Sequence, residues 1–117
     1  MSIALPILFS CMADATRLRI LALLGQEGEL CVCEIVHALS DIQPKISRHL
    51  AILRKEGVVI DDRDGTRVFY QLSPQLPDWI QQMILRVAEE AATEPPYRDD
   101  LARLESMPNR PTRSQVA

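Results

Sequence analysis

The sequence predicts a mainly helical fold with a small β-hairpin, and three observations support that prediction. Apolar residues recur at helical spacing in residues 29–39 and again in 43–55, with a short polar break between them. The second stretch is also basic. Two β-branched and aromatic runs then flank Asp64-Gly65, a strong hairpin turn signal. Two short helices, a tight turn and a following hairpin together predict a winged helix-turn-helix.

Length and composition limit what the chain can be. At 117 residues with 47% hydrophobic content it is expected to form one compact unit with its own core. No apolar run is long enough to cross a membrane, and the start lacks a basic region followed by a cleavable apolar segment. We therefore expect a cytoplasmic protein with no membrane partner.

The first two helices are expected before residue 28. Leu5, Leu8, Phe9 and Met12 form one apolar stripe. A second helix follows up to residue 24, with Asp14 as its expected N-cap, and the segment 25–28, which contains two glycines, should end it.

The helix expected over 43–55 has the character of a DNA-reading helix. Three apolar residues at helical spacing face a core, Pro44 fits the first turn, and four cations occur with no acid in a chain of net charge -3. Such a helix suits the major groove of DNA, although a solvated amphipathic helix has the same pattern. The candidates for base and near-base contacts are Gln43, Lys45, Ser47 and Arg48, and His49 is expected to contact phosphate or pack at the helix edge.

The hairpin expected after this helix would form the wing. Runs at 58–60 and 68–70 supply its strands. Arg63 and Arg67 lie near its tip, where they are expected to contact phosphates or a minor groove.

The late stretch 77–92 is amphipathic and is expected to form a further helix. A small winged-helix core cannot cover every apolar stripe. We therefore expect this helix and the first one to pack against a second copy of the chain, the alternative being that the late helix folds back on its own domain. We assign 1–93 to the DNA-binding and sensing domain, and 94–117 to a short charged helix and a disordered tail from 107 onwards.

Four segments together resemble a known family. ELCVCEI, QPKISRHLAILRKEGVV, DGTRVFYQLSP and the earlier ADATRLRIL are similar to the ArsR family of metal-sensing winged-helix repressors, specifically its arsenite- and antimonite-responsive branch. The resemblance covers roughly residues 5–92. It implies a homodimer on inverted-repeat operator DNA that is released when As(III) or Sb(III) binds cysteine thiolates, with no organic cofactor.

The cysteines are the candidate sensor. An odd number of cysteines, with Cys31 and Cys33 one residue apart, argues for reduced, working thiols and not for a disulfide framework. On a regular helix two positions differ by about 200°. We therefore expect these two thiols on opposite edges of an apolar stripe, so that a soft centre binding both must distort the first turn.

The third ligand is open. In the family, as the resemblance implies it, a third cysteine follows one turn later, and here that place is Val36. Cys11 is the only other thiol, and it either supplies a third sulfur, from its own subunit or across the dimer, or is a small buried hydrophobe. His37 is more typical of a surface residue than of a ligand.

Three other readings remain. One is a thiol-redox switch that pairs Cys31 or Cys33 with Cys11. Another is a sensor of a different metal, although residues 77–92 contain no histidine for the zinc site found in other family members. A third is a winged helix that binds protein instead of DNA. No arrangement of residues typical of an enzyme stands out.

Overall fold

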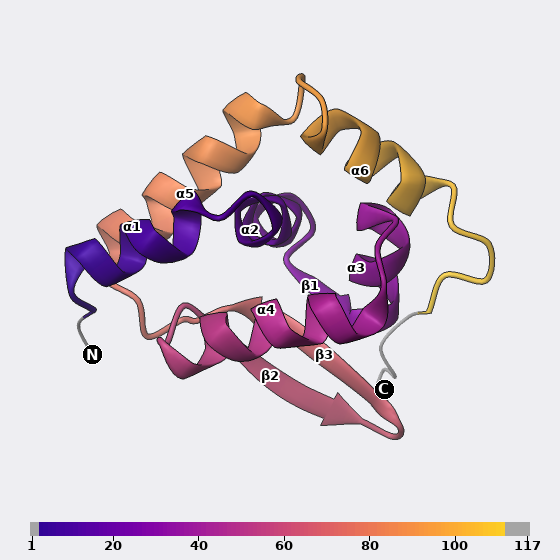
Figure 1. Ribbon diagram of the computed structural model, residues 1–117, viewed down its shortest axis with the longest axis horizontal. Coiled ribbons are helices and arrows are strands. Elements are labelled where there is room, and N and C mark those ends of the chain that lie inside the picture. The colour runs from indigo at the N-terminus through magenta and orange to yellow at the C-terminus, as the bar shows by residue number, and fades with distance from the viewer. Residues whose placement is uncertain (1–2, 112–117) are drawn as a thin grey trace.

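The computed structural model describes residues 3–111, and it confirms the winged helix-turn-helix prediction (Figure 1). In Figure 1 α2 is seen nearly end-on at the centre, with α1 and α5 on one side, α3 and α6 on the other, and α4 with the sheet below. The elements in chain order are α1 (Leu5–Ala13), α2 (Ala15–Glu27), β1 (Glu29–Cys31), α3 (Val32–Leu39), α4 (Gln43–Lys55), β2 (Val59–Asp64), β3 (Arg67–Leu72), α5 (Asp78–Ala91) and α6 (Tyr97–Glu105).

The central helix α2 begins at the predicted cap. The Asp14 side chain accepts a hydrogen bond from the Arg17 amide at 3.0 Å. The helix ends at Glu27, and Gly28 follows with a φ of 88°, a conformation that favours glycine. Gly25 lies inside the helix where α5 crosses closely: a Cβ built there would lie 2.7 Å from the Ala88 Cβ. The absence of a side chain therefore lets the two helices approach.

The sheet has one more strand than the sequence predicted. β2 and β3 pair antiparallel as the expected hairpin, and β1 adds to the other edge of β3 with Cys31 opposite Phe69. The expectation that the helical pattern includes Leu30 was therefore wrong. Leu30 is fully buried from a strand of three residues, which is too short to show an alternating pattern.

The helix-turn-helix forms as predicted from α3 and α4. Ser40 ends α3 in the left-handed conformation with a φ of 52°, and Pro44 lies in the first turn of α4. Ile46, Leu50 and Leu53 are all completely buried against the core. α4 is thus fixed along one face and leaves the opposite face exposed.

The apolar faces of α1 and α5 are only partly covered. α5 packs on α2 through Ile80, Ile84 and Ala88, so the late helix does fold back on its own domain along one face. In α1 the buried residues are Leu8, Cys11 and Met12, whereas two members of the predicted stripe are exposed. The large hydrophobic side chains left exposed on these two helices are Leu5, Ile7, Phe9, Trp79 and Leu85.

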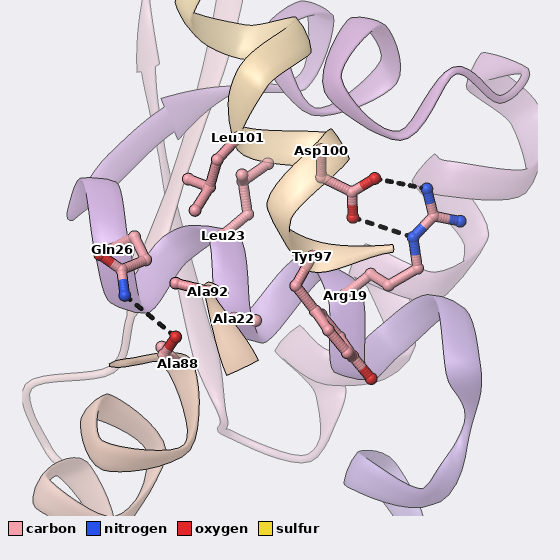
Figure 2. Close-up of a pocket in the computed structure, with 9 residues that line it drawn as sticks. All are labelled: Arg19, Ala22, Leu23, Gln26, Ala88, Ala92, Tyr97, Asp100 and Leu101. Carbon is pink, nitrogen blue, oxygen red and sulfur yellow. Dashed lines mark hydrogen bonds and ion pairs between the residues drawn. The ribbon is translucent and has the colours of Figure 1, made fainter. Parts of the chain in front are cut away.

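The C-terminal helix belongs to the same packed unit. α6 packs on α3 and α2, and its Asp100, 1% exposed, accepts hydrogen bonds from Arg19 Nε at 2.9 Å and Nη2 at 2.7 Å (Figure 2). Arg103 adds a third bond to this carboxylate at 2.8 Å. The predicted boundary after residue 93 is therefore not a structural division.

The predicted disordered tail also begins too early. Arg110 forms ion pairs with Glu27 and Glu34, so residues 107–111 are not a free tail. The rest of the predicted tail, 112–117, lies outside the described residues. Within 3–111 none of the helices combines the length and apolar character needed to cross a membrane.

Candidate functional site

Cys31 and Cys33, the thiol pair, lie at the junction of β1 and α3. Cys31 ends the strand and caps the helix with extended dihedrals (φ −68°, ψ 150°), while Cys33 occupies the first helical turn. Their Sγ atoms are 2.6 Å apart. The expectation that they flank opposite edges of one helix was wrong, because Cys31 is not helical. Both thiols can thus face one ligand.

A buried carboxylate holds this helix start. The Cys31 amide donates to Glu34 Oε1 at 2.9 Å, which is one half of a capping box. Arg110 Nε donates to the other oxygen of Glu34 at 2.6 Å, and Glu34 is only 3% exposed. The sequence analysis missed both residues. The Cys-x-x-Glu spacing was the available signal for Glu34, whereas Arg110 lay in a segment predicted to be disordered.

The environment favours the protonated form of the thiol pair. Desolvation, and secondly the hydrogen bond with Cys31, raise the pKa of Cys33 to about 11. The helix N-terminus alone would act in the opposite direction. A soft centre that binds this pair at neutral pH must therefore displace protons from sulfur.

An open cavity of about 410 Å³ lies beside the thiol pair, and we call it the thiol cavity. Its walls come from three functional elements: the start of α3, the DNA-reading helix α4, and the wing formed by β2, β3 and their turn. It is lined by Cys31, Val32, Cys33, Gln43, Ser47, Thr66, Arg67, Val68 and Tyr70. A group bound by the thiols therefore lies next to the residues expected to read DNA.

The structure does not bring Cys11 to the thiol pair within one chain. Cys11 is 3% exposed in the core beneath α1, and burial raises the pKa of its thiol. Within residues 3–111 no three His, Cys, Asp or Glu side chains form a group that could hold a metal ion. His37 is exposed near the end of α3, and Val36 is partly buried. A third sulfur from the partner subunit stays a prediction.

The exposed face of α4 presents the predicted DNA-contacting residues. Gln43, Ser47 and Arg48 are exposed, whereas Lys45 is half-buried and forms an ion pair with Asp41 at 2.8 Å. Arg63 and Arg67 are both exposed near the tip of the wing, where Gly65 turns the chain with a φ of 65°. Two cationic surfaces thus flank the mouth of the thiol cavity.

His49 points the other way. It is 7% exposed, and its Nδ1 lies 3.2 Å from Arg17 Nη1 and 3.7 Å from Asp14 Oδ2 at the junction of α1 and α2. Burial lowers the pKa of His49, and since arginine can only donate, Nδ1 accepts in a neutral ring. His49 therefore packs at the helix edge, and its predicted contact with phosphate was wrong.

An exposed reading helix, a wing and a thiol pair opening between them define a winged-helix regulator with a site for a soft ligand. Residues 14–61 match the family model described as "Bacterial regulatory protein, arsR family". The chain is 48% identical over 106 residues to the arsenic resistance transcriptional regulator ArsR1 of Pseudomonas putida, covering 91% of this chain and 81% of that one. It is 53% identical over 85 residues to the arsenical resistance operon repressor of Escherichia coli, covering 72% and 73%. The chain belongs to the ArsR family of transcriptional regulators.

Solved structures agree with the fold. HlyU from Vibrio cholerae superposes with a TM-score of 0.64 at 34% identity, over 72% of this chain and 87% of that one. The antimony-specific repressor AntR gives 0.61 at 26% identity, over 77% and 82%. The homodimeric winged helix-turn-helix domain Mb0332 from Mycobacterium bovis gives 0.61 at 27% identity, over 77% and 82%.

Proposed function

We propose that this protein is a cytoplasmic, homodimeric repressor that binds operator DNA and is released when As(III) or Sb(III) binds Cys31 and Cys33. The observation that carries the proposal is the position of the thiol pair. Its two sulfurs are 2.6 Å apart, and they line the cavity whose other walls are the reading helix and the wing. Soft thiolate donors favour soft centres such as trivalent arsenic and antimony.

DNA binding is assigned to the exposed face of α4 and to the wing. Arg48, Gln43 and Ser47 have the hydrogen-bonding groups that base edges in a major groove accept or donate to, and Arg63 and Arg67 are suited to the phosphate backbone. Two copies related by a two-fold axis would place their α4 helices in successive major grooves of an inverted repeat, about 10 bp apart or a multiple of that.

Dimerisation is assigned to α1 and α5. Five large hydrophobic side chains remain exposed on these two helices, which both pack on α2. Isolated apolar side chains on a surface are ordinary, but a cluster on neighbouring packed elements is typical of an interaction surface. The homodimeric relative from Mycobacterium bovis supports the same arrangement.

Inducer binding is coupled to DNA binding through the first turn of α3. A metalloid bonded to both sulfurs must separate them from their present contact, and Cys31 is also the cap of α3 and the end of β1. Movement there changes the position of α3 against β3 and α4. The inducer thus favours a different arrangement of the DNA-reading surface, which is the differential interaction that coupling requires.

The test is fluorescence anisotropy on the DNA upstream of the protein's own gene, with and without arsenite, in a phosphine reductant that does not compete as a dithiol. We expect arsenite to release the wild type, whereas Cys31→Ser and Cys33→Ser variants stay bound. Cys11→Ser is the matched control for loss of a thiol. Failure of that variant to respond would place a third sulfur across the dimer, and no release of the wild type would contradict the proposal.

A redox sensor that pairs the thiols with Cys11 has less support. Cys11 lies in the core under α1, on the side of Figure 1 opposite α3. Release by arsenite under full reduction would exclude redox as the required signal, because no oxidant is present.

A further inference from the structure

The thiol cavity has room beyond what a single inorganic centre needs. Trivalent arsenic forms three bonds, and the thiol pair supplies two of them. Within residues 3–111 the structure offers no third thiol beside the pair, and the nearby Glu34 carboxylate is already held by the Cys31 amide and Arg110. The third bond therefore points to something that the protein does not supply from this subunit.

The walls of the cavity indicate what that third group is. Val32, Val68 and Tyr70 contribute apolar surface directly beside the two sulfurs. The volume of about 410 Å³ falls within the range of roughly 300–1,000 Å³ that small organic ligands occupy. A hydroxyl group would leave most of this space to water, whereas a carbon substituent would bury apolar area.

We propose that the thiol cavity binds the organic substituent of a monosubstituted trivalent arsenical, with arsenic bonded to Cys31 and Cys33. This inference rests on the proposed function, since it uses the same two sulfurs. The step is a condensation: R–As(OH)₂ and two thiols give R–As(S-Cys)₂ and two molecules of water. Two As–S bonds replace two As–O bonds, both thiol protons leave in the water, and arsenic stays trivalent.

Such a ligand would also act directly on the DNA-reading surface. Gln43 and Ser47 on α4 and Arg67 on the wing line the same cavity. A substituent that fills the space between α4 and the wing lies against residues assigned to DNA contact. An organoarsenical is thus expected to release DNA at a lower concentration than inorganic arsenite does.

The experiment compares phenylarsine oxide with arsenite, each in competition with dithiothreitol, using native mass spectrometry of the arsenic adduct. A small dithiol has no cavity, so its own preference between the two arsenicals is the reference. We expect the wild-type protein to exceed that preference by at least about tenfold, as expected from burial of an aromatic ring. Anisotropy on operator DNA should show the same order of potency.

Two variants on one strand locate the substituent. Val68→Phe fills the cavity and should return the preference to the dithiothreitol value, with arsenite affinity unchanged. Leu72→Phe introduces the same side chain on β3 outside the cavity lining and should leave the preference intact. Retained arsenite binding shows that each variant is folded, and Thr66→Tyr at the exposed wing tip fills the cavity without touching the core.

The outcomes separate this inference from the proposed function. A wild-type preference equal to that of dithiothreitol, or an unchanged preference in both Val68→Phe and Thr66→Tyr, overturns the organoarsenical site while leaving arsenite sensing in place. If neither arsenical binds the thiol pair, the proposed function itself fails.

Discussion

At the scale of single residues, the conformation of Cys31 decides the chemistry of the site. In a helix the two side chains of a C-x-C sequence diverge by about 200°. Extended dihedrals at Cys31 turn its side chain so that the two sulfurs come within 2.6 Å. A single capping residue therefore converts two diverging thiols into one bidentate donor.

Arg48 is expected to contribute specificity. It is exposed on α4, the helix assigned to the major groove. Replacing it with alanine should weaken operator binding by about 1–3 kcal/mol if it pairs with guanine, and weaken binding to random DNA much less. Anisotropy titrations on both DNAs at one salt concentration measure the difference. Arg86→Ala, an exposed arginine on α5, is the control, and equal weakening on both DNAs would assign Arg48 to phosphate.

His49 is expected to make the fold sensitive to mild acid. Its side chain is buried against Arg17 and Asp14, and burial lowers its pKa from the ordinary value of about 6.5. The stabilisation from the neutral ring is complete above pH 6.5. It is lost as the pH falls from there through the lower pKa of the folded state, because the unfolded chain binds the proton more readily.

The His49→Gln variant isolates this effect, since its side chain does not titrate. Urea unfolding near pH 7.5 and 5.5 should show a larger loss of stability in the wild type than in the variant. Equal losses would mean that His49 is charged in the folded protein, paired with Asp14. Protein concentration must be the same throughout, because dimerisation adds to the apparent stability.

At the scale of elements, α6 shows how a segment outside the helix-turn-helix supports the site. Arg19 joins it to α2 through Asp100, Arg103 donates to the Ala38 carbonyl near the end of α3, and Arg110 reaches Glu34 near the start of α3 (Figure 2 shows the Arg19–Asp100 pair). Both ends of the helix that carries Cys33 are therefore tied to the C-terminal segment. α6 and the residues after it restrict how α3 can move.

Asp100 and its neighbour Asp99 form a matched pair for testing this anchor. Both lie in the first turn of α6, so both interact equally with the helix dipole. Asp100→Ala leaves Arg19 and Arg103 without their carboxylate and should cost about 2–4 kcal/mol, towards the lower part of that range because Arg19 is partly exposed. Asp99 makes an exposed pair with Arg98, so Asp99→Ala should change stability by less than about 0.5 kcal/mol.

Urea unfolding of both variants measures this difference, and hydrogen exchange of the α3 amides should rise only in Asp100→Ala. Equal losses of stability in the two variants would show that the buried pairing contributes little beyond an ordinary surface ion pair.

At the scale of the whole molecule, periodicity predicted the elements that are long and one-sided. α2, α4, α5 and the wing all follow apolar or turn patterns, because each buries one face on the core. Periodicity failed where the determining contact is long-range or the element is short. β1 exists because β3 pairs with it, and Arg110 is ordered because Glu27 and Glu34, far earlier in the chain, bind it.

The same limit explains the candidate site. Its residue types were predictable, since C-x-C and a cationic helix are local patterns. The adjacency of the sulfurs and the inward direction of His49 were not, because both depend on how α3 and α4 dock on α2 and β3. The thiol cavity likewise exists only where three separate elements meet.

The dimer is the property of the whole molecule most open to a direct test. Phe9 on α1 and Trp79 on α5 are 50% and 54% exposed, so charged replacements there need not disturb the core. Phe9→Glu and Trp79→Glu would each bury an unpaired carboxylate in the proposed interface, which is strongly unfavourable. We expect sedimentation velocity to show monomers, with operator affinity reduced because each monomer reaches only one half-site. Ile42→Glu, at an exposed position in the turn before α4, should remain dimeric. Dimers that persist in both Phe9→Glu and Trp79→Glu would assign the interface to another surface.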